Sequence, residues 1–159
     1  MSFHDIIEHN APIETWFGVG GTAQTLARPK SVEQLVDVLH AHAGQRVRVV
    51  GDGANLLVHD DGVDGLVVSL EQLNNVDCPG YDVTASPSRP REVIATVGAG
   101  VNLPKMIVES VRLGMEGIEV LAGIPASVGG AIAMNAGGAF GEIADVIESV
   151  ECVTQTGSR

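Results

Sequence analysis

The hydrophobic pattern in the first part of the chain alternates between the spacing of strands and the spacing of a helix. A short strand is predicted over 23–29 and ends at Pro29. Later apolar runs predict a strand over 47–50, a strand and turn over 56–62, and a strand over 65–70. Because a helical stretch separates the first two strands, this order favours a small parallel or mixed sheet.

A helix is predicted between the first two strands, over 31–44. Ser31 can cap its first turn, and Gln34 follows three residues later, which makes a capping box. Gly44 suits the left-handed residue that ends many helices. One face of the helix carries its apolar stripe, which consists of Val32, Leu35, Val36 and Leu39.

A second lobe is predicted after Leu70, so that the two lobes cover residues 1–70 and 71–159. It opens with a polar, turn-rich stretch over 74–92 that contains three prolines and predicts a hairpin or a long loop. A strand is predicted next, over 93–100. At 159 residues the chain is long enough for one medium domain or for two small lobes that share a core, here a small α/β lobe and a second lobe of sheet and helix.

A regular helix is predicted in the second lobe over 102–114. Asn102 is the expected N-cap, Pro104 lies in the first turn, and Gly114 ends the helix. A last strand is predicted over 146–157, and its final residues have the composition of a hairpin turn.

The segment 121–142 is strongly apolar, yet six of its residues are glycine. Glycine inside an element weakens it by roughly 0.5–1 kcal/mol relative to alanine, so these positions indicate a close approach to the backbone. Residues 127–130 are expected to form a loop-to-helix junction whose free N–H groups face an anion. Residues 131–134 would be the short helix, ended by Asn135 and Gly137. Tight packing of a helix against a sheet is the alternative explanation.

Two more glycine loops follow predicted strands. The first contains two glycines around one residue, which lets successive N–H groups point into one concavity; it consists of Gly51, Asp52, Gly53, Ala54 and Asn55. An ordinary turn explains this loop equally well, and the carboxylate of Asp52 would repel a phosphate unless it points away. The second loop, 98–100, is expected to pack beside the first. Gly18, Gly20 and Ala23 fit a dinucleotide fingerprint, but no helix follows them, which argues against that fold.

The charge balance limits which ligands the chain can hold. Nine Lys and Arg residues against 20 Asp and Glu residues give a formal net charge of −11. The negative electrostatic field of such a chain repels a polyanion, so nucleic-acid binding is excluded. A ligand with a phosphate would have to be held by backbone N–H groups and helix N-termini.

The remaining chemistry-bearing residues form no recognisable site. Cys78 and Cys152 match neither a metal nor a redox pattern, and the five histidines do not cluster. Nothing suggests a signal peptide or an apolar run of the roughly 18 residues that a membrane span needs. We expect a cytoplasmic protein without a metal, a membrane anchor or a protein partner.

Five motifs, taken in chain order, resemble the UDP-N-acetylenolpyruvoylglucosamine reductase family, also called UDP-N-acetylmuramate dehydrogenases. They are TWFGVGG, VVGDGANLLVHDDGVDGLVV, VGAGVNL, GMEGIEVLAGIPASVGGAIAMNAGG and FGEIADVIESVECVT. The resemblance implies an α+β fold, namely a two-lobed FAD-binding domain of the vanillyl-alcohol-oxidase type. It also implies a reaction in which NADPH reduces the enolpyruvyl ether of a UDP-sugar to a muramic acid precursor of peptidoglycan.

The resemblance also implies a cofactor site. The loop from Gly51 to Asn55 would hold the FAD pyrophosphate without a covalent bond. Further residues would line the diphosphate and the isoalloxazine ring: Gly123, Ile124, Pro125, Ser127, Val128, Gly129, Gly130, Ala131, Asn135 and Gly137. The sequence departs from the family pattern at Ala54 and Ala126, where serine and glycine are usual, and in an extra residue of NAGGAFG.

The family's catalytic Arg, Ser and Glu belong to motifs that this sequence does not contain, so no catalytic residue is expected within it. The second lobe is accordingly expected to be truncated, and the family's C-terminal substrate-binding domain to be absent. The alternatives are another flavoprotein oxidase or dehydrogenase of the same fold, or an FAD-binding module without catalysis.

Overall fold

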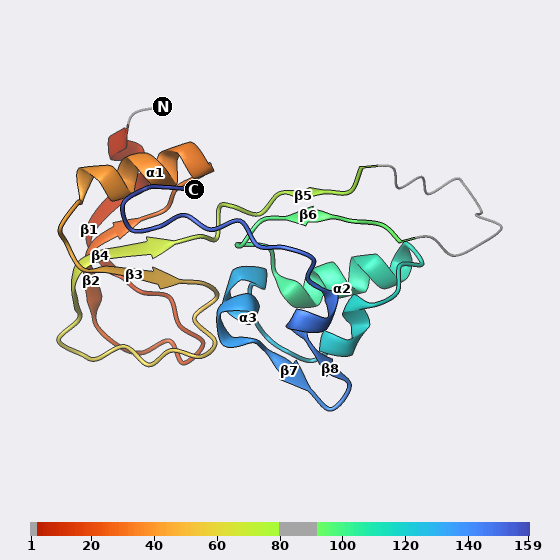
Figure 1. The fold of residues 1–159 in the computed structure, drawn as a ribbon. Coiled ribbons are helices and arrows are strands. Elements are labelled where there is room, and N and C mark those ends of the chain that lie inside the picture. Colours follow the sequence, from red (N-terminus) through yellow and green to blue (C-terminus); the bar gives the residue numbers. More distant parts are fainter. Residues whose placement is uncertain (1–2, 80–91) are drawn as a thin grey trace.

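The computed structural model describes residues 3–79 and 92–159. In the first lobe, a four-stranded mixed sheet has the strand order β1-β2-β4-β3 (Figure 1). β1 (Ile7–Pro12) is antiparallel to β2 (Thr22–Ala27), whereas β4 (Val63–Ser69) is parallel to both β2 and β3 (Val47–Val50). The three parallel strands therefore end at the same edge of the sheet. The expectation of a parallel or mixed sheet is confirmed, but the pattern did not reveal β1.

The predicted helix of the first lobe is α1 (Val32–Ala41), which covers one face of the sheet (Figure 1). Ser31 caps it as expected, because its hydroxyl accepts a hydrogen bond from the Gln34 N–H at 3.3 Å. The predicted capping box is wrong. It requires the Gln34 side chain to accept from the N–H of Ser31, but that side chain accepts from the N–H of Lys30, one residue earlier, at 2.8 Å. The backbone N–H of Glu33 and then the Ser31 hydroxyl lower the pKa of the Glu33 carboxyl.

The second lobe is built from short elements (Figure 1). Two β-ribbons flank its helices: β5 (Val76–Asp77) with β6 (Thr96–Val97), and β7 (Gly137–Gly138) with β8 (Gly141–Glu142). The helices are α2 (Leu103–Arg112) and α3 (Val128–Met134). Single 3-10 turns complete the element order of the chain: η1 (Phe3–Ile6), η2 (Ile118–Leu121) and η3 (Ile143–Val146).

Hydrophobic side chains fill both faces of the sheet because neighbouring residues of a strand point to opposite sides. Leu66 and Val68 of β4 pack with Val38 of α1, whereas Val67 packs with Leu26 on the other face. A separate core fills the second lobe, and it consists of Val101, Leu103, Ile107, Leu121, Val128, Ala131 and Ile143.

Three predicted strands are wrong or too long. Residues 56–59 form no strand, because the backbone of Gly20 and Gly21 packs against this stretch and Gly21 donates to the His59 carbonyl at 3.0 Å. The strand predicted over 93–100 is limited to β6. Residues 147–157 contain no strand. Part of the hairpin or loop predicted over 74–92 lies outside the described residues.

The last residues return from the second lobe to the first, where the end of the chain lies beside α1 (Figure 1). Val153 packs against the core beneath α1, and His40 Nε2 is 2.9 Å from the Thr156 carbonyl oxygen. The turn predicted at the end of the chain is present, since the Gly157 N–H donates to the Thr154 carbonyl at 2.9 Å. The two lobes are thus joined at two places along the sequence.

Leu66 is fully buried on the central strand β4, so Leu66→Ala tests the first-lobe core. We expect it to reduce the free energy of unfolding by about 2–5 kcal/mol, because it leaves a cavity that the sheet cannot close. Urea unfolding followed by circular dichroism measures the change. Leu57→Ala is the control, since Leu57 is 78% exposed. An equal effect of the two substitutions would contradict the packing described.

Candidate functional site

A cavity of about 280 Å³ lies outside the carboxyl ends of the three parallel strands. Ligands of open α/β sheets commonly bind at this edge. Its lining combines residues that end or follow the strands with loop residues: Ile13, Glu14, Trp16, Leu26, Arg28, Val50, Gly51, Asp52, Ser69, Glu71 and Asn102. Asn102 comes from the second lobe, so the cavity lies where the two lobes meet.

The first glycine loop forms one wall of this cavity. Within residues 3–79 and 92–159, the backbone N–H groups of Gly51 to Asn55 donate no hydrogen bond to a protein acceptor. Gly53 has a φ of +66°, and a Cβ at this position would lie 2.4 Å from the Glu14 carbonyl oxygen, so glycine is required there. A loop of unpaired N–H groups is suited to bind an anion.

The second predicted segment contacts this loop directly. A Cβ on Gly51 would lie 2.3 Å from Ser127 Oγ and 3.9 Å from Gly130 Cα. The glycine at position 51 therefore allows the backbone of β3 to approach the start of α3. Two segments separated by some seventy residues of sequence, both predicted as site residues, are adjacent in the structure.

The expected helix start and the expected free N–H groups of this segment are both wrong. α3 begins at Val128, three residues before the predicted start, with Ser127 as its N-cap. Its first N–H groups all have acceptors within the chain: Val128 donates to the Val101 carbonyl at 2.8 Å and Gly129 to the Ala99 carbonyl at 2.8 Å. Gly130 donates to Ser127 Oγ at 3.2 Å, and Ala131 donates to the Ser127 carbonyl at 2.9 Å. The first two bonds come from packing against the loop at 99–101, and the last two come from the cap at Ser127. The alternative of a helix packed tightly on a sheet is therefore right about close packing but wrong about the partner, which is a loop.

The other predicted residues belong to other parts of the second lobe. Asn135 ends α3 with a φ of +44°, and Gly137 pairs with Glu142 in the β7–β8 ribbon. An α-helix of this length places its two ends about 10 Å apart. Gly123, Ile124 and Pro125 belong to the connection between η2 and α3, where Ile124 packs on the second-lobe core.

The Asp52 carboxylate is bound by the second lobe. Asn102 Nδ2 donates to Asp52 Oδ2 at 3.1 Å. The same amide caps α2 as predicted, because its Oδ1 accepts from the Lys105 N–H at 3.1 Å. The loop at 98–100 also packs at this junction, since a Cβ on Gly129 would lie 2.8 Å from the Ala99 Cβ.

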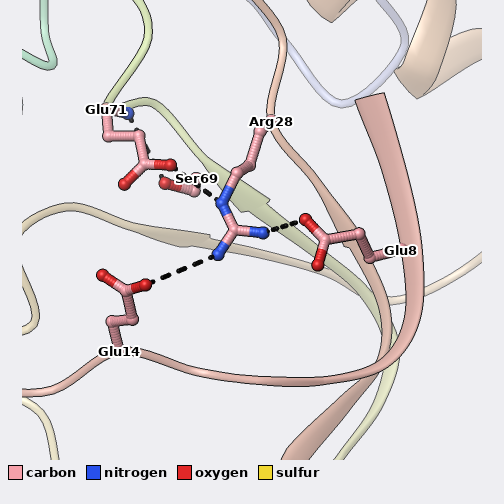
Figure 2. Close-up of polar contacts among 5 residues, drawn as sticks. All are labelled: Glu8, Glu14, Arg28, Ser69 and Glu71. Carbon is pink, nitrogen blue, oxygen red and sulfur yellow. Dashed lines mark hydrogen bonds and ion pairs between the residues drawn. The ribbon is translucent and has the colours of Figure 1, made fainter. Parts of the chain in front are cut away.

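Arg28 connects three carboxylates at the rim of the cavity (Figure 2). Its Nε donates to Glu71 Oε1 at 2.8 Å, Nη1 contacts Glu8, and Nη2 lies 4.0 Å from Glu14 Oε1. The Arg28 side chain is only 22% exposed. The guanidinium is thus neutralised by its neighbours, and it ties β1 and the next loop to the turn after β4.

The sequence analysis missed Arg28, Glu71 and Asn102 as cavity residues. A usable signal was present, because Arg28 and Glu71 follow two strands closely, and parallel strands bring the residues after them to one edge. The described residues contain no group of three or more His, Cys, Asp or Glu side chains that could hold a metal ion. No helix in 3–79 and 92–159 is long and apolar enough to cross a membrane.

Comparison with known protein families shows which family the chain belongs to. A family described as the FAD binding domain matches residues 23–159. The chain belongs to this family. The match begins within β2 and includes the cavity edge, the first glycine loop and the whole of α3.

Relatives of this FAD binding domain confirm the resemblance stated from the motifs. A UDP-N-acetylenolpyruvoylglucosamine reductase of Desulfosudis oleivorans is 35% identical over 161 residues, covering 99% of this chain and 50% of the relative. One of Latilactobacillus sakei subsp. sakei is 38% identical over 153 residues, covering 94% and 46%. The chain therefore spans about half the length of these relatives.

Solved structures confirm the fold. A UDP-N-acetylenolpyruvylglucosamine reductase from Thermus caldophilus superposes with a TM-score of 0.62 at 39% identity, covering 82% of this chain and 42% of that chain. A cholesterol oxidase from B. sterolicum gives 0.56 at 20% identity, covering 86% and 26%. The second likeness concerns the fold alone. The FAD binding domain is thus of the two-lobed, vanillyl-alcohol-oxidase type.

The contact between α3 and the turn at Ala99 predicts an unusual result for a helical glycine. Gly→Ala inside a helix ordinarily stabilises it by about 0.5–1 kcal/mol. Gly129→Ala is expected instead to lower the free energy of unfolding by about 1–3 kcal/mol, because the new Cβ overlaps the Ala99 Cβ and lies 3.0 Å from its carbonyl oxygen. Chemical denaturation measures the effect.

Gly130→Ala is the matched control in the same helix. Its new Cβ would meet only the Ser127 hydroxyl, at 3.1 Å, so we expect a smaller loss than at Gly129. Stabilisation of the protein by Gly129→Ala would show that α3 does not pack on this turn.

Proposed function

We propose that the chain is the FAD-binding part of an NADPH-dependent reductase that converts UDP-N-acetylglucosamine enolpyruvate to UDP-N-acetylmuramate. The observation that carries the proposal is the row of unpaired N–H groups from Gly51 to Asn55, at the carboxyl edge of the sheet in an FAD binding domain. The similarity to UDP-N-acetylenolpyruvoylglucosamine reductases supports the choice of reaction.

The charges around the cavity favour backbone binding of the pyrophosphate. The net charge of the chain is −11, and Arg28 is engaged with Glu8 and Glu71. Neutral N–H donors of the loop at 51–55 can bind a diphosphate without a cation. Glycine at 130 would let a flat ligand approach bare backbone, while α3 contributes shape more than hydrogen bonds.

The proposed roles of the remaining site residues follow from their positions. Gly123, Ile124 and Pro125 would line the isoalloxazine ring. Asn135 and Gly137 would form the end of the cofactor-lining surface that lies beyond α3. Bound FAD supplies the chemistry of accepting a hydride from NADPH and passing it to the enolpyruvyl group. Residues 1–159 would bind and orient the cofactor, whereas the proton that completes the reduction would come from outside them.

Three properties complete the proposal. The lobes would divide at residues 70 and 71, directly after β4, although Val153 returns to the first-lobe core. The substrates would be a UDP-sugar and NADPH, with no protein partner required. The reaction would take place in the cytoplasm, where UDP-sugars and NADPH are made.

The flavin is expected to be held without a covalent bond, because the loop at 51–55 offers no histidine, cysteine or tyrosine that could attach it. Loading the protein with FAD and precipitating it with acid separates the two cases. Yellow colour in the supernatant is the expected result. Colour that stays in the protein pellet after acid treatment would contradict it.

This chain alone is expected not to convert the enolpyruvyl substrate to product, because the general acid is proposed to lie outside residues 1–159. Loss of a general acid typically lowers the reaction rate by 10²–10⁴-fold. The test supplies NADPH and UDP-N-acetylglucosamine enolpyruvate to the FAD-loaded protein and measures UDP-N-acetylmuramate by mass spectrometry. A reductase of full family length is the positive control. Formation of product at a rate near that of the control would place the catalytic groups within residues 1–159.

A further inference from the structure

Asn102 makes a side-chain hydrogen bond from the second lobe to the first at the cavity. Its Nδ2 donates to Asp52 Oδ2 at 3.1 Å, and its Oδ1 accepts from the Lys105 N–H at 3.1 Å. Asn102 also forms an isolated antiparallel bridge with Ser127. The side-chain amide of Asn102 therefore joins the first glycine loop to the start of α2, while the backbone at Asn102 pairs with the residue that caps α3.

The Asp52 carboxylate has an alternative position that would close the anion site. An Asp in a tight loop commonly accepts hydrogen bonds from backbone N–H groups two or three residues further along. In this loop those donors belong to Ala54 and Asn55. Neither donates to Asp52 in the described structure, where the carboxylate accepts from Asn102 instead. The contact with the second lobe thus leaves the loop's own donors free.

We propose that Asn102 is a positioning residue that holds the Asp52 carboxylate away from the N–H groups of residues 51–55 and so keeps the phosphate-binding loop open. The inference rests on the proposed function, because it assigns the open loop to the FAD pyrophosphate. A carboxylate turned into the loop would both occupy the donors and repel a diphosphate. Asn102 prevents both effects while it fixes the loop to α2.

A capping role for Asn102 alone makes different predictions from this positioning role. Ser and Asp are about as good at an N-cap as Asn. Asn102→Ser therefore keeps the cap and replaces the amide donor to Asp52 by a hydroxyl on a shorter side chain, which does not extend as far as the amide nitrogen. Asn102→Asp also keeps the cap but places a second carboxylate opposite Asp52. If Asn102 were only a cap, neither substitution would change FAD binding.

The decisive experiment exchanges the two side chains. FAD affinity is measured by titration monitored through flavin fluorescence for the wild type, N102S, N102D, D52N and the double variant D52N/N102D. We expect N102S and N102D to weaken FAD binding by about tenfold or more, the size of a lost hydrogen bond to a charged group. D52N should bind as well as the wild type or better.

The double variant is expected to bind FAD within about threefold of the wild type. Asn at position 52 would then donate to Asp at position 102, and the carboxylate would remain on the α2 side of the junction. Ser31→Asn is the matched control, because it replaces the N-cap of α1 away from the cavity and should leave the affinity unchanged. Unchanged binding in N102S and N102D, or a double variant as weak as N102D, would overturn the inference.

A second measurement separates this inference from the proposed function. Thermal unfolding without ligand should show N102D below the wild type and D52N/N102D restored towards it, because only the single variant opposes two carboxylates. A wild type that fails to bind FAD would refute the proposed function. In that case the Asn102–Asp52 contact is judged by unfolding alone, and equal melting temperatures for N102D and the double variant would overturn it.

Discussion

The approach of the β3 backbone to the start of α3 is the constraint on which the site depends. It is possible only because Gly51 has no side chain, since a Cβ there would overlap the Ser127 hydroxyl. Through this contact, the loop after β3 lies against the second lobe. The cavity then opens at the carboxyl ends of three parallel strands, where both lobes contribute to its lining. The candidate site therefore depends on the same close contact that joins the loop after β3 to the second lobe.

The second determinant of the candidate site is which backbone N–H groups have an acceptor within the protein. At the start of α3 the N–H groups serve packing, because they donate to Val101, Ala99 and Ser127. In the loop from Gly51 to Asn55 they have no acceptor in the described part of the chain. In a protein with a net charge of −11, this difference is the reason for proposing that a phosphate binds at the loop from Gly51 to Asn55 and not at the start of α3.

Local signals in the sequence were sufficient for much of the fold. Ser31 and Asn102 cap their helices as predicted, and the apolar runs at β2, β3 and β4 are strands. The strand predicted over 56–62 failed because Leu56 and Leu57 are exposed and the nearby glycines pack against backbone. Apolar composition cannot distinguish such a loop from a strand. The strand predicted near the end of the chain failed for a related reason, since this stretch packs through Val153 on the first lobe and not in a ladder.

The candidate site was predictable only in part. Glycine spacing indicated both segments, and the structure brings Gly51 and Ser127 together. Which N–H groups remain free depends on tertiary partners such as Ala99 and Val101, and no local pattern contains that information. The most direct test of the central claim is the ¹H–¹⁵N spectrum of the protein during titration with FAD. The amides of Gly51 to Asn55 are predicted to shift most, while those of Val128 and Gly129 change little. Unshifted loop amides, or the largest shifts at Val128 and Gly129, would contradict the assignment of the pyrophosphate to this loop.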